Sequence, residues 1–197
     1  MNRRERKKEK TKDSIINCAI EFFRLKGFHE TSMEEIAEKS DVSKGTLYNY
    51  FKDKESILVA YFQLLISNHS EKINESFIEN KDMKSRLNEL LDFINHIFRN
   101  DIELASIYFR YRVQTLFNSN IIENTQRSGL ESLVLKIMKE SQDNNEIRCD
   151  IPLAIISRNF MFLYMNFFVS SIYGKEFFEI DILKNQLIDL FVNGSKL

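Results

Sequence analysis

Ser32–Phe51, SMEEIAEKSDVSKGTLYNYF, has the pattern of two short helices joined by a tight turn. In each half, apolar residues recur three or four positions apart, as they do on one face of a helix. Ser32 stands three residues before Glu35, which is the spacing of a capping box, and Ser43 can cap the second helix. The stretch therefore predicts two capped helices with a break between them.

The beginning of the second helix has an unusual charge pattern. Helix N-termini carry partial positive charge and usually attract acidic side chains, yet no acidic residue occurs from Val42 to Lys52. Gly45 would cost about 1 kcal/mol relative to alanine inside a helix, which is easiest to understand if a foreign surface approaches the backbone there. Such a helix suits the phosphates and base edges of a DNA major groove. The alternative is that the two helices form only a packing corner.

A longer pattern surrounds these two helices. The chain resembles the N-terminal DNA-binding domain of the TetR family of transcriptional regulators at Gly27-Phe28, Thr31-Ser32, Ile36-Ala37, Val42 to Phe51, and Lys54-Glu55. The resemblance covers roughly residues 11–60, and the remainder fits the family in length and helical character. Asp41 departs from the pattern because the family usually has glycine in this turn. Aspartate tolerates left-handed backbone better than most residues, so we expect the turn to survive.

The resemblance implies a set of DNA contacts on the second helix and beside it. The expected contacts to bases or groove edges are Thr46, Tyr48 and Asn49; the expected phosphate contacts are Lys44, Tyr50, Lys54 and the Thr31 hydroxyl; Ser43 and Gly45 complete the expected interface. Lys54 could equally be a solvated charge at the start of a helix. A two-fold dimer would bind double-stranded DNA at inverted half-sites one or a few helical turns apart.

Composition favours an all-α fold, because 43% of the 197 residues are hydrophobic and only one proline and five glycines are present. Charge is uneven, with a balance of +5 over residues 1–12 and −3 over residues 56–197, so the N-terminal end is expected to face a polyanion. We expect residues 1–12 to be a disordered arm, either solvated or lying along DNA.

Several observations favour a cytoplasmic protein without a membrane partner. We find no apolar run long enough to cross a bilayer, and the charged N-terminus does not resemble a signal peptide. Cys18 and Cys149 belong to no motif and are expected to be buried thiols.

Periodicity and turn residues predict the remaining helices. The expected ranges are 13–26, 54–78, 83–99, one or two helices within 102–117, then 122–141, 152–173 (with Pro152 in its first turn) and 180–192. The expected domains are residues 1–55, an N-terminal arm with a three-helix helix-turn-helix DNA-binding domain, and residues 56–197, a helical effector-binding and dimerisation domain.

The helix expected over residues 152–173 has almost no polar face, so it must be covered on nearly every side. Together with the last helix it fits the family's dimer interface, a four-helix bundle with two helices from each subunit. One intramolecular core is the alternative.

The C-terminal half of such regulators usually contains a pocket for an effector. The residues that could line one are Phe93, His96, Tyr108, Phe109, Tyr111, Phe117, Phe160, Tyr164 and Phe167. Core packing is the alternative for most of them. The polar groups Arg110, Arg112 and Gln114 nearby favour an uncharged or anionic apolar ligand.

Enzymatic function is not supported, since the sequence has no glycine-rich phosphate loop, no metal-ligand spacing and no nucleophile signature near its three histidines. We expect no cofactor and no metal. The resemblance implies a homodimeric, sequence-specific DNA-binding regulator, a repressor released from a palindromic operator by a small apolar ligand. The alternative is a helical small-molecule-binding or structural protein without DNA-binding activity.

Overall fold

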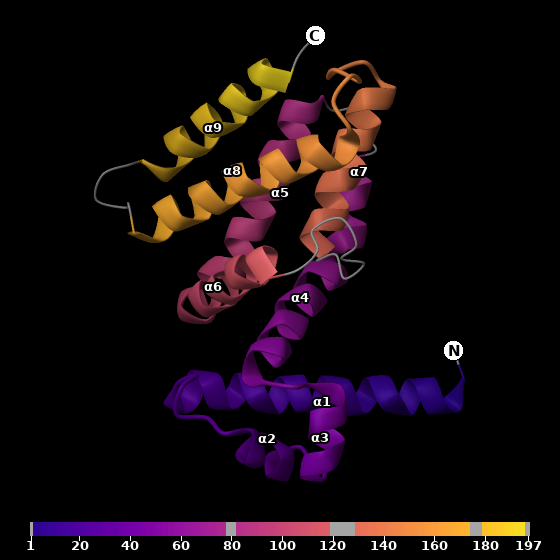
Figure 1. The fold of residues 1–197 in the computed structure, drawn as a ribbon, viewed down its shortest axis with the longest axis vertical. Coiled ribbons are helices and arrows are strands. Elements are labelled where there is room, and N and C mark those ends of the chain that lie inside the picture. Colours follow the sequence, from indigo (N-terminus) through magenta and orange to yellow (C-terminus); the bar gives the residue numbers. More distant parts are fainter. Residues whose placement is uncertain (1, 78–81, 119–128, 174–178, 196–197) are drawn as a thin grey trace. The chain divides into compact units, whose positions relative to one another are not determined.

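The computed structural model describes residues 2–77, 82–118, 129–173 and 179–195, and within these ranges it contains only helices (Figure 1). The all-α prediction is therefore confirmed. The elements are α1 (Arg3–Lys26), α2 (Met33–Lys39), α3 (Lys44–Tyr50), α4 (Lys54–Phe77), α5 (Met83–Arg99), α6 (Ile102–Asn118), α7 (Gly129–Asp143), α8 (Leu153–Tyr173) and α9 (Ile180–Ser195).

The chain divides into two compact units, and the division falls inside α4. The first unit is Met1–Leu64 with Glu103–Ser119, and the second is Leu65–Ile102 with Asn120–Leu197. α6 therefore belongs to the same unit as the first three helices. The expected functional boundary between residues 55 and 56 stays a prediction.

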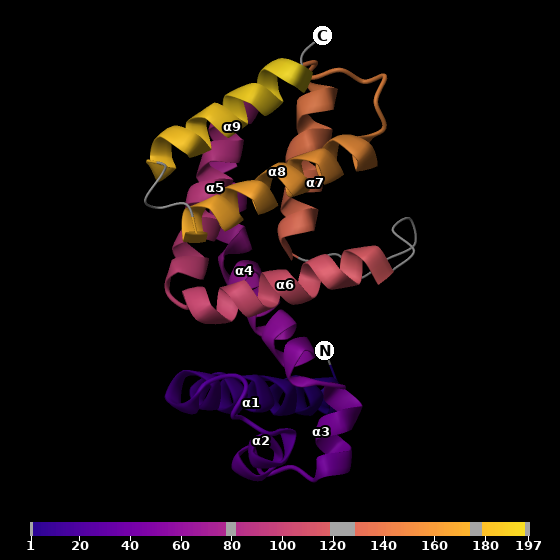
Figure 2. The same cartoon turned by 60° about the vertical axis from the view of Figure 1, so that its left-hand side comes forward.

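In the first unit, α2 and α3 lie on the same side of α1 in both views (Figures 1 and 2). The first half of α4 is tied to α1 by a hydrogen bond of 2.9 Å that the Arg24 guanidinium donates to the Tyr61 hydroxyl. α6 packs on α4, because the rings of Phe62 and Tyr108 lie 5.0 Å apart. The core of the unit includes Ile15, Ile16, Ala19, Ile20, Phe23, Ile36, Leu47, Ile57 and Leu58, all less than 5% exposed.

The first helix begins at Arg3, so the predictions of a helix start near Asp13 and of a disordered arm are wrong. Asn2 and Glu5 form a capping box, in which each side chain accepts a 2.9 Å hydrogen bond from the other residue's backbone N–H. Arg, Lys and Glu are also good helix formers. The capping-box spacing was present in the sequence, with asparagine in place of serine as the cap.

Most other helix predictions agree with the structure to within a few residues. α5 has the predicted limits, and 102–117 holds a single helix. The expected start of α7 near residue 122 lies outside the described residues. Pro152 precedes α8 rather than lying in its first turn, and its carbonyl accepts hydrogen bonds from Ile155 and Ile156.

The second unit packs α7 against α8, and α9 against both α5 and α8. Figures 1 and 2 show α8 and α9 side by side. Two ion pairs fix α9 on α5. The Lys184 ammonium lies 2.5 Å from the Asp92 carboxylate, and the Lys84 ammonium lies 2.7 Å from that of Asp189.

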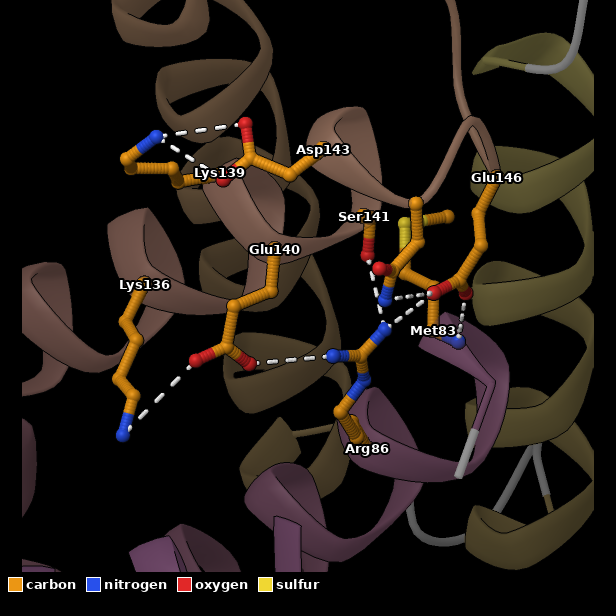
Figure 3. A network of polar contacts seen from close by, with 9 residues as sticks. Met83, Arg86, Lys136, Lys139, Glu140, Ser141, Asp143 and Glu146 are labelled. Carbon is orange, nitrogen blue, oxygen red and sulfur yellow. Dashed lines mark hydrogen bonds and ion pairs between the residues drawn. The ribbon is translucent and has the colours of Figure 1, made fainter. Parts of the chain in front are cut away.

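A buried arginine joins α5 to the end of α7 (Figure 3). The Arg86 side chain is 4% exposed, and its guanidinium lies 3.1 Å from the Glu140 carboxylate and 2.5 Å from that of Glu146. The same guanidinium donates to the Ser141 hydroxyl at 3.2 Å. Glu146 also accepts a 2.5 Å hydrogen bond from the Met83 N–H, at the first residue of α5. One charged cluster therefore fixes α5 to α7 and to the loop after α7.

α8 leaves an apolar line on the surface. Ile155, Phe162 and Val169, spaced seven residues apart, are 43%, 50% and 47% exposed. On α9, Ile182 and Leu190 are 51% and 70% exposed. By length and composition α8 could also cross a membrane, so the prediction that no apolar run is long enough is wrong; a buried core helix meets the same test.

Both cysteines are free thiols, but the prediction that both are buried is wrong. Cys149 is exposed because it lies in the loop after α7, whereas Cys18 is half-buried on α1. Burial raises the pKa of the Cys18 thiol.

Candidate nucleic-acid interface

The turn between α2 and α3 is a left-handed turn at Asp41. Asp41 has φ of 54°, so the expectation that aspartate would take the place of glycine here is confirmed. The Asp41 N–H donates to the Glu38 carbonyl at 3.1 Å, and the Val42 N–H donates to that of Ala37 at 3.0 Å. These bonds satisfy carbonyls at the end of α2 and direct the chain into α3.

The predicted capping box of α2 is present. The Ser32 hydroxyl accepts a hydrogen bond from the Glu35 N–H at 3.2 Å, and the Glu35 carboxylate accepts one from the Ser32 N–H at 2.9 Å. Glu35 also forms an ion pair with Lys26 of α1. Contact with Lys26, together with the Ser32 hydrogen bonds, lowers the pKa of Glu35 to about 2. This carboxylate therefore both starts α2 and holds it against α1.

The start of α3 is capped but otherwise open. The Ser43 hydroxyl accepts a hydrogen bond from the Thr46 N–H at 3.1 Å, as predicted, and its oxygen lies 2.8 Å from the Thr46 hydroxyl. The first turn of α3 contains no acidic residue. Lys44, Gly45, Tyr48 and Asn49 are exposed, while Thr46 and Tyr50 are half-buried. The exposed end of α3 thus carries cationic, hydroxyl, amide and aromatic groups.

An acidic residue that the sequence pattern did not reveal lies beside this end. The Glu34 carboxylate of α2 is 3.3 Å from the Lys44 ammonium, and both side chains are at least half exposed. A backbone hydrogen bond and then the contact with Lys44 hold the pKa of Glu34 below its usual value. Because ten positions separate the two residues, only the packing of α2 against α3 brings them together.

Two expected phosphate contacts already have partners inside the first unit. The Thr31 hydroxyl is buried and donates to the Gly27 carbonyl at 2.8 Å. The Lys54 ammonium donates to the carbonyls of Phe28, His29 and Thr31 at 2.7 to 3.1 Å. Their phosphate contacts stay predictions, and the structure gives both groups a role in closing the loop after α1.

Gly45 offers a test of why glycine stands in α3. Among the residues that the structure describes, a Cβ built there would meet only the Ser43 hydroxyl oxygen, at 4.0 Å, so packing against them does not require glycine. We expect Gly45→Ala to raise the free energy of unfolding by up to about 1 kcal/mol and to weaken DNA binding. Urea unfolding and a gel shift measure the two effects, and tighter DNA binding would contradict the interpretation of Gly45 as a point of close approach.

The predicted effector residues divide between the two units. In the first unit, Tyr108 packs on Phe62, Phe109 lies beside Tyr108, and the Tyr111 ring lies 6.0 Å from the Lys52 ammonium. The Phe117 side chain lies outside the described residues.

In the second unit, Phe160, Tyr164 and Phe167 of α8 are no more than 1% exposed. Phe93 lies against His69, and His96 is exposed. Core packing explains the burial of these α8 aromatic residues equally well as a role in an effector pocket would. Their effector contacts therefore stay predictions. An open groove of about 510 Å³ over α9 and the start of α5 includes none of the predicted effector residues; it is lined by Lys84, Asn185, Gln186, Asp189, Leu190 and Asn193.

Within the described residues, no group of three or more His, Cys, Asp or Glu side chains could hold a metal ion.

Comparison with known proteins identifies relatives of the whole chain. Residues 15–61 match the family described as bacterial regulatory proteins, tetR family. The chain is 25% identical over 183 residues to the fatty acid metabolism regulator protein of Bacillus subtilis, covering 91% of this chain and 93% of that protein. It is 24% identical over 160 residues to the transcriptional regulator UidR of Escherichia coli, covering 80% of each.

Solved structures share the fold. Thermus thermophilus FadR, a TetR family transcriptional repressor in complex with lauroyl-CoA, matches with a TM-score of 0.77 and 22% identity, over 94% of this chain and 95% of that chain. Bacillus subtilis FadR in complex with stearoyl-CoA matches with a TM-score of 0.62 and 20% identity, over 92% and 97%.

Proposed function

We propose that this chain, a DNA-binding transcriptional regulator of the TetR family, is a cytoplasmic homodimeric repressor released from an inverted-repeat operator by a long-chain acyl thioester. The observation that carries the proposal is the exposed start of α3, where Lys44, Tyr48 and Asn49 are accessible to a duplex. Thr46 and Tyr50 add a hydroxyl and a phenol on the same short helix.

Homodimerisation is supported by the apolar line on α8. Ile155, Phe162 and Val169 recur every seven residues, and all are between 43% and 50% exposed. A seven-residue apolar repeat suits packing of one helix against another. A second copy of α8 and α9 would cover this line, and a two-fold axis would then present two copies of α3 to DNA.

The effector class is proposed from the relatives and from the chemistry of the chain. Two FadR structures with this fold hold lauroyl-CoA and stearoyl-CoA, and the Bacillus subtilis relative is a fatty acid metabolism regulator. An acyl thioester combines a long apolar chain with anionic phosphates. On α6, the predicted effector residues Tyr108, Phe109 and Tyr111 suit the apolar chain, and the exposed Arg110 of the same helix suits a phosphate.

A gel shift with the region upstream of the gene for this protein tests the proposal. We expect a shift that survives an excess of random-sequence duplex and disappears when stearoyl-CoA is added, while coenzyme A alone leaves it intact. A shift that stearoyl-CoA does not alter would contradict the proposed effector but leave the proposed DNA binding intact. The absence of any sequence-selective shift would favour a helical binding protein that does not bind DNA.

Lys44 and Glu34 provide a paired test of the interface. We expect Lys44→Ala to weaken binding to all sequences and to lower the salt slope by about one for each lysine removed. Glu34→Gln should strengthen binding to all sequences, because it removes a carboxylate that lies 3.3 Å from the Lys44 ammonium and would repel phosphate.

Binding measured across a range of salt concentrations checks both changes. Lys139→Ala on α7 is the control because it removes a cation of equal exposure, 65%, from the second unit. An unchanged salt slope for Lys44→Ala would show that Lys44 contacts no phosphate.

A further inference from the structure

Three backbone carbonyls hold the ammonium group of Lys54. It donates to the carbonyls of Phe28 and Thr31 at 2.7 Å each and to that of His29 at 3.1 Å. Because a lysine ammonium has three N–H donors and no acceptor, these bonds use its whole hydrogen-bonding capacity. The ammonium also lies 4.8 Å from the centre of the Phe28 ring, within reach of a cation–π interaction. A phosphate oxygen could bind the ammonium only by displacing one of these carbonyls.

The helix termini on either side explain why a cation lies here. Lys54 is the first residue of α4, where the partial positive charge of a helix N-terminus disfavours a cation. The carbonyls that it contacts follow Gly27, which ends α1 with φ of 93°. The C-terminus of a helix carries partial negative charge and favours a cation. Lys54 therefore lies at the unfavourable end of its own helix and serves the favourable end of another.

The ammonium closes α2 and α3 into a ring. The bonded carbonyls precede α2 and Lys54 follows α3, so the bonds join residues 23 to 26 positions apart on either side of the two helices. Thr31 is followed directly by Ser32, the cap of α2. At the other end of the ring, the cap of α3 is Phe51, which is 5% exposed and donates its N–H to the Leu47 carbonyl at 2.9 Å. One side chain thus ties the start of α2 to the chain just after α3.

We propose that Lys54 is a positioning residue for DNA reading and that it contacts no phosphate. This inference rests on the proposed function. By fixing the start of α2 and the end of α3 to the first residue of α4, the ammonium sets the orientation in which α3 meets base edges. Base contacts carry the sequence preference, whereas a phosphate contact contributes to binding of every duplex. Loss of the ammonium should therefore reduce the preference for the upstream region without changing the salt dependence of binding.

The test compares Lys54→Met and Lys54→Arg in the full-length chain, on the upstream region and on a random-sequence duplex, across a range of salt concentrations. Methionine keeps a flexible side chain without the charge. Arginine keeps the charge and binds phosphate well, but its planar guanidinium does not replace a compact ammonium among three carbonyls. We expect both variants to bind the upstream region about tenfold more weakly, the effect of losing one charge-assisted hydrogen bond. The affinity for the random duplex and the slope of log K against log salt should stay close to those of the parent.

Lys44→Met is the matched control, because it removes a lysine that is 65% exposed and is predicted to contact phosphate. It should weaken binding to both duplexes and lower the salt slope by about one. Urea unfolding of each variant checks that it is folded under the conditions of the binding measurement.

Two results would overturn the proposal. A salt slope that falls by about one in Lys54→Met but is kept in Lys54→Arg would make Lys54 a phosphate contact. Parent-like binding of the upstream region by both variants would mean that the ammonium does not orient α3.

Failure of the proposed function is seen separately, as a parent protein that does not prefer its upstream region over the random duplex. Hydrogen exchange without DNA then still tests whether Lys54 fixes the start of α2. We expect the backbone N–H groups of Ser32 and Glu35 to exchange faster in Lys54→Met than in Lys44→Met. Equal exchange in the two variants would contradict the positioning role.

Discussion

Replacing Arg86 by alanine is expected to lower the free energy of unfolding by about 3 kcal/mol, the lower end of the range for breaking a buried ion pair. The guanidinium is 4% exposed and contacts two carboxylates, of which Glu146 would lose this cation and Glu140 would keep the more distant Lys136, at 3.9 Å. Glu140 and Glu146 are 37% and 23% exposed, so water would solvate them in part, which places the effect at the lower end. Urea unfolding followed by circular dichroism measures the change.

Lys139→Ala is the matched control for Arg86→Ala. The Lys139 ammonium lies 2.9 Å from the Asp143 carboxylate on the same helix, but both side chains are more than 60% exposed. Exposed pairs of this kind contribute about 0 to 1 kcal/mol. If the two variants are destabilised equally, the Arg86 cluster does not hold α5 to α7 in the way that Figure 3 indicates.

Introducing a charge into the apolar line of α8 is expected to separate the proposed dimer. Phe162 is 50% exposed and lies midway between Ile155 and Val169. In a two-fold dimer Phe162→Glu would occur on both copies, and an aromatic residue central to an interface contributes at least about 2 kcal/mol. We therefore expect the dimer dissociation constant to rise by more than about 30-fold, with a parallel reduction in operator affinity.

Sedimentation equilibrium of the parent protein and of the Phe162→Glu variant measures the dimer dissociation constant. Leu25→Glu is the control, because Leu25 is 73% exposed on α1 and lies outside the α8 line. A Phe162→Glu protein that stays dimeric would place the interface elsewhere, and a monomeric parent protein would show that the apolar line has another partner.

Local sequence signals predicted α2, α3 and the turn between them well. The capping box at Ser32 and Glu35, the cap at Ser43 and the turn at Asp41 each depend on residues within a few positions of one another. Such bonds form between near neighbours in the chain, so their spacing in sequence is sufficient to predict them. The same rule places the start of α1 at Asn2 and Glu5, where asparagine is the cap.

Contacts between distant residues could not be predicted in this way. Glu34 reaches Lys44 only because α2 and α3 cross, and Lys54 reaches the loop after α1 from 23 to 26 residues away. The Arg86 cluster joins residues 54 to 60 positions apart. No periodic pattern encodes such pairs, because their geometry depends on how whole helices pack.

The sequence by itself determined that the chain is helical and that an open, acid-free helix end follows Ser43, since helix caps and apolar periodicity act over one or two turns. Only the tertiary structure decided which groups each charged side chain contacts. It placed Glu34 beside Lys44 and gave Lys54 three carbonyl partners. The physical reason is that a charge is neutralised by whatever lies within a few ångströms in space, and the distance along the chain does not determine that neighbour.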